Sequence, residues 1–357
     1  MGRLKTQNHI GRNVLTLPVS ALLAIGLWWF PQCQFSREYA VSLLMALLTA
    51  YIIVESNNTY QLIRVRSYMI SSLWFFCMAT MGMFHTSPPA LFASFCLATS
   101  HYLLFRTYQR PQAVTDTFHT FLMLSVGCLA YAPLLLMAPF FLWYILVFMR
   151  SLSLRSFFAA LVGLVTPFWF WVGWLMWKND FSSVLEWWNG LSTMLSGCAF
   201  WKLQDIKAIS WAEDGYGGMA IADFISYAFC LIVLGLLVVW TSVYYLSNSY
   251  YDKIRTRMMF YIYIFQATLV LVFLLLSATT FCLSGGTVGR EAFASLPLLL
   301  LNTTPLAAHY FTLSLTWTSL VVFFLTLILF VGLAMFSLWP ACADIVINFV
   351  NTSSFIG

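Results

Sequence analysis

The sequence contains few charged residues. Lys, Arg, Asp and Glu make up only 8% of its 357 residues, and only 12 side chains are acidic. Soluble globular domains carry about a quarter charged residues. The apolar share is 61%, which is more than a water-soluble core can bury. The composition therefore excludes an ordinary soluble domain and predicts an integral membrane protein.

The sequence also lacks the common metal and nucleotide motifs. Its eight cysteines form no C-x-x-C pair, and its five histidines show neither H-x-x-x-H nor H-E-x-x-H spacing. The glycine-rich stretch 285–291 has no Gly-Lys-Ser/Thr ending and so is not a phosphate-binding loop. We expect no metal and no cofactor. Free thiols buried in apolar helices are favoured over disulfides, although pairing among some cysteines stays open.

Long apolar runs occupy most of the chain. A helix needs about 20 apolar residues to cross a bilayer. The runs predict eleven spanning helices, at 14–30, 39–54, 68–84, 89–105, 117–130, 133–148, 157–177, 220–245, 260–281, 296–313 and 319–339. Polar residues interrupt the run 296–313, and the count without it is ten. The predicted fold is all-α, a single polytopic transmembrane bundle over 1–357.

One pair of runs predicts a membrane hairpin. Arg106 and Arg110 precede an apolar stretch that is too long for one crossing, and Arg150 and Arg155 follow it. The sequence Tyr-Ala-Pro at 131–133 lies near the middle of this stretch. We therefore expect the chain to turn at 131–133 and both ends of the hairpin to lie on the same side.

The distribution of Lys and Arg predicts the orientation, because cytoplasmic loops are enriched in both. With the N-terminus inside, the inner segments hold 12 of the 17 basic residues: Arg3, Lys5, Arg12, Arg64, Arg66, Arg106, Arg110, Arg150, Arg155, Lys253, Arg255 and Arg257. The outer segments hold the other five: Arg37, Lys178, Lys202, Lys207 and Arg290. The net charge of +5 is thus a sign of topology and gives no support to nucleic-acid binding. Eleven spans place the C-terminus outside, and ten place it inside.

The segment 178–218 is the longest connection between predicted spans and lies outside in this topology. Val184, Leu185 and Trp188 lie near one face of its first half, with Ser182 and Glu186 near the other. This spacing predicts an amphipathic helix in the membrane interface.

Polar residues near the cytoplasmic ends of two predicted spans are candidates for a polar cavity. Asp116 and His119 are three residues apart and share a helix face. His101 ends the preceding span, and Arg106 and Arg110 follow it. Hydrogen bonds between helices are the alternative explanation for these side chains, and we favour it.

Three outer residues are further candidates. Arg37 and Arg290 could bind an anionic ligand, with a salt bridge at the protein surface as the alternative. Glu38 is the acid in the first outer loop and is a candidate catalytic base, the kind of group that polyprenyl-phosphate-dependent glycosyltransferases use. That loop is short for such an enzyme. His85 and His309 stand alone in the sequence.

Three segments together resemble a known family. They are ESNNTYQLIRVRSYM at 55–69, HYLLFRTYQRPQAV at 101–114 and FMRSLSLRSFFAALVGLVTPFWF at 148–170. This order resembles an uncharacterised family of polytopic inner-membrane proteins of Bacteroidota, a domain of unknown function. The resemblance implies a location in the bacterial cytoplasmic membrane.

The sequence leaves three functional classes open. An accessory component of the bacterial envelope is favoured, because it requires no catalytic group. The alternatives are an enzyme acting on a lipid-linked substrate, of the glycosyltransferase or polymerase type, and a transporter. The expected partners are membrane lipid and either envelope proteins or a lipid-linked glycan. Whether the protein is an enzyme is not decided by the sequence.

Overall fold

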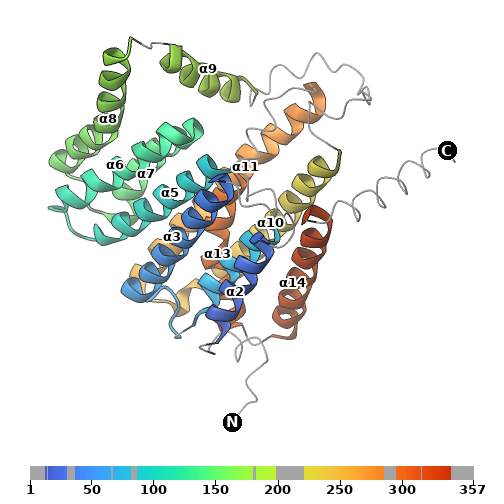
Figure 1. Cartoon of the computed structure of the whole chain (residues 1–357). Coiled ribbons are helices and arrows are strands. Elements are labelled where there is room, and N and C mark those ends of the chain that lie inside the picture. The colour runs from blue at the N-terminus through green and yellow to red at the C-terminus, as the bar shows by residue number, and fades with distance from the viewer. Residues whose placement is uncertain are drawn as a thin grey trace.

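The computed structural model describes residues 13, 15–29, 37–65, 67–81, 87–179, 182–197, 221–284, 295–314 and 316–338. Within these ranges the regular structure is helical, as predicted (Figure 1). The elements are α2 (Thr16–Trp29), α3 (Arg37–Tyr60), α4 (Met69–Thr80), α5 (Pro88–Arg106), α6 (Val114–Ala130), η2 (Ala132–Met137), α7 (Ala138–Tyr144), η3 (Ile145–Met149), α8 (Leu154–Trp177), α9 (Ser182–Gly197), α10 (Ile221–Asn248), η5 (Ser249–Tyr251), α11 (Ile254–Ser284), α13 (Leu296–Leu313) and α14 (Trp317–Leu338). Each of the eleven predicted runs corresponds to a helix or, for 133–148, to the continuous unit η2–α7–η3.

Six of these helical segments are long and apolar enough to cross a membrane. They are Arg37–Tyr60, Ala132–Met149, Leu154–Trp177, Ser226–Tyr251, Ile254–Ser277 and Trp317–Met335. Shorter apolar helices at Thr16–Trp28, Met69–Thr80 and Val114–Ala130 pack among them. Large apolar side chains are exposed on the surface of the bundle, including Trp169 and Phe170 of α8. Such a surface is stable when lipid covers it, and the chain is therefore an integral membrane protein.

Helix α13 lies at the centre of the bundle. Its bounds are those predicted for the tenth run, and every residue from Leu296 to Thr312 is buried against α4, α5, α10, α11 and α14. Asn302, Thr303 and Thr304 hydrogen-bond to carbonyl oxygens one turn earlier, at 2.7–2.8 Å. These bonds satisfy the two threonine hydroxyls and the amide NH₂ of Asn302 inside their own helix, whereas Oδ1 of Asn302 has no hydrogen-bond partner among the described residues. Bonding within the helix lowers the cost of burying a run with weak hydropathy.

The predicted turn of the chain at 131–133 is confirmed. Helix α6 ends at Ala130, and the chain turns at Tyr131 into η2, α7 and η3. Arg150 then adopts a left-handed backbone conformation with φ of 51° and ends the helix. The backbone N–H of Gln109, just before α6, donates to Met149 O at 2.8 Å. This bond joins the two ends of the hairpin directly.

Helix α8 packs closely on α6 at one glycine. A Cβ atom at Gly163 would lie 2.5 Å from the backbone oxygen of Phe118, so only glycine fits. Beside it, the Ser125 hydroxyl donates to Leu164 O at 2.6 Å. The helix continues through Pro167. Small residues that allow close backbone approach are typical of helix pairs in membranes.

Helix α9 coincides with the helix predicted at the start of segment 178–218. The side chains that hold it to the bundle differ from the apolar face identified in the sequence. Trp187 donates from Nε1 to Cys128 O at 3.1 Å, and Leu191 is buried, whereas Leu185 and Trp188 are exposed. The exposed pair belongs to the apolar face that we expect to enter the membrane interface.

Candidate functional site

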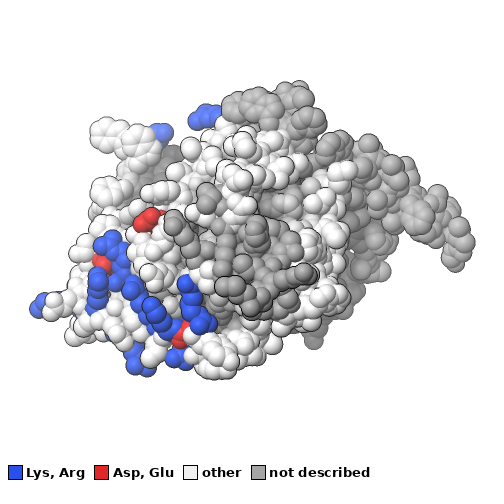
Figure 2. Space-filling model, turned by 90° about the horizontal axis from the view of Figure 1, so that it is seen from below, with Lys and Arg blue, Asp and Glu red and all other residues white. Residues whose placement is uncertain are grey.

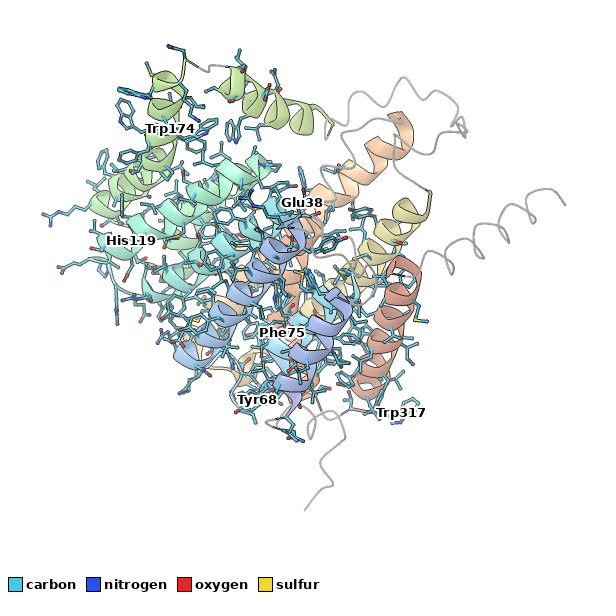
Figure 3. The ribbon with its side chains drawn as sticks, in the orientation of Figure 1. Glu38, Tyr68, Phe75, His119, Trp174 and Trp317 are labelled. Carbon is cyan, nitrogen blue, oxygen red and sulfur yellow. The ribbon has the colours of Figure 1, made fainter. Side chains whose placement is uncertain are left out.

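The connections after α3, α5, η3, α10 and α13 meet at one end of the bundle. Ser67 Oγ lies 3.3 Å from Thr312 Oγ1, although 245 residues separate them. Lys and Arg side chains gather at this end (Figure 2). We call this end the basic face. It is defined by the described Lys and Arg residues of these connections and of the adjoining helix turns, which are Arg64, Arg106, Arg110, Arg150, Arg155, Lys253, Arg255 and Arg257. Tyr68 and Trp317 lie toward this end, and Glu38 and Trp174 toward the other (Figure 3).

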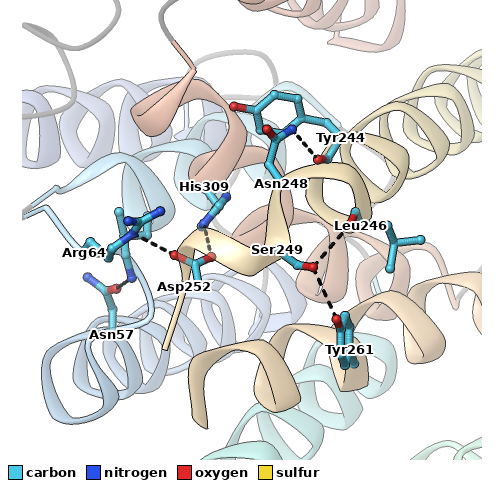
Figure 4. Close-up of polar contacts among 10 residues, drawn as sticks. Asn57, Arg64, Tyr244, Leu246, Asn248, Ser249, Asp252, Tyr261 and His309 are labelled. Carbon is cyan, nitrogen blue, oxygen red and sulfur yellow. Dashed lines mark hydrogen bonds and ion pairs between the residues drawn. The ribbon is translucent and has the colours of Figure 1, made fainter. Parts of the chain in front are cut away.

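A buried carboxylate joins three of these connected elements. Asp252 follows η5, and its side chain is only 1% exposed. Its Oδ1 lies 2.7 Å from Nε of Arg64, which stands between α3 and α4, and its Oδ2 lies 3.0 Å from Nε2 of His309 in α13 (Figure 4). The contact with Arg64 has the distance of an ion pair but not the alignment of a hydrogen bond. Asp252 therefore fixes the α10–α11 turn to two other parts of the bundle.

Aromatic rings hold His309 in position. The rings of Tyr245 and Phe260 each lie with their centroids 4.9 Å from that of His309 and meet it at steep angles. Among the described residues Nδ1 of His309 has no hydrogen-bond partner, so Nε2 must carry the proton donated to Asp252. The interpretation of His309 as an isolated histidine was wrong, because the partner lies 57 residues away in the sequence.

The surroundings of Asp252 lower its pKa. Burial alone would raise the pKa of this carboxyl, because it removes water from the charged form. The hydrogen bond from His309 and the charges of His309 and Arg64 act in the opposite direction and outweigh burial. The pKa of Asp252 consequently lies below its ordinary value, and the group is ionised at neutral pH.

A pocket of about 470 Å³ opens beside Arg64. It is formed by the end of α3, the connection 61–68 and the start of α4. Its polar lining comes from Asn57, Asn58, Gln61, Arg64, Ser67 and Ser71, and its other lining residues are Val54, Ile63, Val65, Tyr68 and Ile70. This pocket could not be predicted from the amino-acid pattern, because its wall is assembled from a helix end and an irregular loop.

The predicted polar candidates do not form one cluster. Arg106 Nε lies 3.6 Å from Asp116 Oδ1, a partly exposed ion pair between α5 and α6. Arg110 is exposed in the turn between the two helices. His119 bonds through Nδ1 to Thr115 O of its own helix at 2.8 Å.

His101 lies apart from them in an aromatic cluster. Its side chain is buried, stacks on Phe105 and Phe141, and meets Tyr263 edge-on at 5.2 Å. Among the described residues neither ring nitrogen has a hydrogen-bond partner. The hydrogen bond between helices that we favoured for His101 is therefore wrong, because the ring packs as an aromatic side chain.

The outer candidates lie at the opposite end of the molecule. Arg37 and Glu38 are exposed in the first turn of α3. Arg290 and His85 fall outside the described residues. Within the ranges that the structure describes, no group of three or more His, Cys, Asp and Glu side chains is placed to hold a metal ion.

The fold and the basic face together define a multi-pass helical membrane protein. Comparisons with protein-family models, with curated proteins and with solved structures find no match.

Proposed function

We propose that the protein is an accessory component of the bacterial envelope, embedded in the cytoplasmic membrane with its basic face toward the cytoplasm. The observation that carries the proposal is the network of Arg64, Asp252 and His309. In this network the buried carboxylate of Asp252 contacts Arg64 and His309 and so connects the ends of several helices near the proposed membrane boundary. Unlike a paired charge at mid-membrane, which marks many transport pathways, this arrangement supports a scaffold.

The centre of the described bundle supports the same role. Central helix α13 is buried from Leu296 to Thr312, and the hydroxyls of Thr303 and Thr304 and the amide NH₂ of Asn302 bond to their own helix. Side chains used in this way stabilise a packed interior. Membrane lipid and neighbouring envelope proteins are the partners that such a scaffold would contact.

A second candidate is an enzyme acting on a lipid-linked substrate, favoured by the exposed carboxylate of Glu38 at the end opposite the basic face. A general base must be accessible to the hydroxyl that it deprotonates. Glu38 meets that condition, and the following experiment separates the two roles.

The test is a deletion strain complemented with either the wild-type gene or Glu38→Gln. An accessory role predicts an envelope defect that both genes restore equally, with no accumulation of a lipid-linked glycan. Accumulation of such an intermediate that Glu38→Gln fails to clear would replace the accessory role with the enzymatic one.

A further inference from the structure

The pocket beside Arg64 has the lining of an anion-binding site. Arg64 is the single charged side chain among its described lining residues. Asn57 accepts through Oδ1 from the backbone N–H of Ile63 at 3.3 Å, which leaves its amide NH₂ as a donor. Asn58 and Gln61 are exposed at the pocket and contribute further amide groups. A donor-rich pocket without a carboxylate favours an anionic ligand.

The guanidinium group of Arg64 is positioned by Asp252 and remains accessible to such a ligand. Its Nε contacts Asp252, and its side chain remains 45% exposed. Within the described part of the chain, the two terminal guanidinium nitrogens make no hydrogen bond, so both are available. Asp252 is 1% exposed and is also bonded to His309. The planar pair of NH₂ groups on an arginine matches two oxygens of a phosphate.

An apolar stripe on α3 leads to this pocket. Leu44, Leu48 and Tyr51 are exposed by 51%, 36% and 65%. Helical periodicity places Asn58 on the same face, about two turns beyond Tyr51 and four turns beyond Leu44. Glu55 lies on this face between Tyr51 and Asn58, so the apolar part of the stripe ends at Tyr51. The distance from Leu44 to Asn58 along the axis is about 21 Å, and one leaflet of a bilayer has a hydrocarbon depth of about 15 Å. An acyl chain lying on the stripe would bring its head group to the pocket.

We propose that this pocket binds the phosphate group of an anionic amphiphile from the leaflet beside the basic face. Arg64 contacts two phosphate oxygens, and the amides of Asn57 and Asn58 donate to the remaining polar groups. The acyl part lies along Leu44, Leu48 and Tyr51. This inference does not depend on the accessory role proposed above.

The test measures binding of three probes to the full-length protein in neutral detergent. The probes are dihexanoyl phosphatidylglycerol, dihexanoylglycerol without phosphate, and soluble glycerol phosphate. The proposal predicts saturable binding of the phosphatidylglycerol and much weaker binding of dihexanoylglycerol. Binding of the lipid without comparable binding of glycerol phosphate would support the proposal. Glycerol phosphate binding as tightly as the lipid would show a soluble phosphate ligand and would overturn the proposed amphiphile.

Variants then locate the site. Arg64→Gln is compared with Arg110→Gln, which removes an exposed arginine of the same face outside the pocket. Because Arg64→Gln also frees Asp252, Asn58→Asp provides a second variant that leaves the ion pair intact. It adds a negative charge to the pocket wall and should weaken lipid binding about tenfold or more.

Gln112→Glu is the matched control, an amide-to-carboxylate change in the exposed turn between α5 and α6. It should leave the affinity unchanged. Absence of saturable phosphatidylglycerol binding, equal binding of dihexanoylglycerol, or a folded Asn58→Asp protein with wild-type affinity would each overturn the proposal.

Discussion

Asp252 shows how this bundle accommodates a buried charge. A carboxylate that loses water needs partners for both oxygens, and Arg64 and His309 supply them at 2.7 and 3.0 Å. Asp252→Asn keeps the shape and removes the charge, so we expect it to lower the free energy of unfolding by about 1–3 kcal/mol. Unfolding in mixed detergent micelles measures this value.

The control for that substitution is Glu55→Gln. Glu55 accepts a hydrogen bond from Thr59 one turn away on the helix surface, and its replacement should change stability by less than about 0.5 kcal/mol. Equal effects of the two substitutions would show that the Asp252 network does not stabilise the fold.

The stabilisation by Asp252 should also depend on pH. Because its pKa is lowered in the folded state, its contribution is complete above the ordinary aspartate value of about 3.9 and is lost as pH falls through the lower folded value. The stability difference between wild type and Asp252→Asn should be constant from pH 7 to about 5 and shrink toward pH 3. A difference that grows on acidification would contradict the assigned direction.

This network could not be predicted from the sequence. His309 and Asp252 belong to different elements 57 residues apart, and no local spacing connects them. Topology placed Arg64 and the segment after α10 on the same side, but the burial of Asp252 depends on how α13 packs against that turn. By contrast, Asp116 and Arg106 are near neighbours across one short turn, and their proximity was visible in the sequence.

At the scale of elements, the contact between α6 and α8 depends on Gly163. Its nearest obstacle is the backbone oxygen of Phe118, which cannot move like a flexible side chain. Gly163→Ala should therefore force the helices apart and lower stability by about 1–3 kcal/mol. The apparent unfolding free energy in micelles is again the measurement.

Gly173 provides a matched control on the same helix, because a Cβ atom there would meet nothing within 4 Å. Gly173→Ala should change stability by less than about 0.5 kcal/mol. If Gly163→Ala were as well tolerated as Gly173→Ala, the close approach of α6 and α8 would be refuted.

The helices themselves were predictable because each is an apolar run with polar ends. The packing of these helices against one another was less predictable. Lipid tails are as apolar as a protein core, so hydropathy does not distinguish a lipid-facing helix from a central one. Helix α13 had a weak apolar signal and is the most buried, whereas α8 had a strong one and exposes Trp169 and Trp177.

At the scale of the whole molecule, we predict that the connections alternate between two sides of the membrane and that the basic face is cytoplasmic. The helices place the turns after α3, α5, η3, α10 and α13 at one end (Figure 1). We predict that this end is cytoplasmic because cytoplasmic segments are enriched in Lys and Arg. The assignment depends on α13 crossing the membrane.

Single cysteines, introduced in a background without native cysteines, test this arrangement most directly. Glu186 in α9, Lys253 after η5 and Trp317 at the start of α14 are all exposed. A membrane-impermeant maleimide should label Glu186→Cys in intact spheroplasts, and label Lys253→Cys and Trp317→Cys only after permeabilisation. Labelling of Trp317→Cys together with Glu186→Cys would show that α13 does not cross, and labelling of all three from outside would contradict the topology.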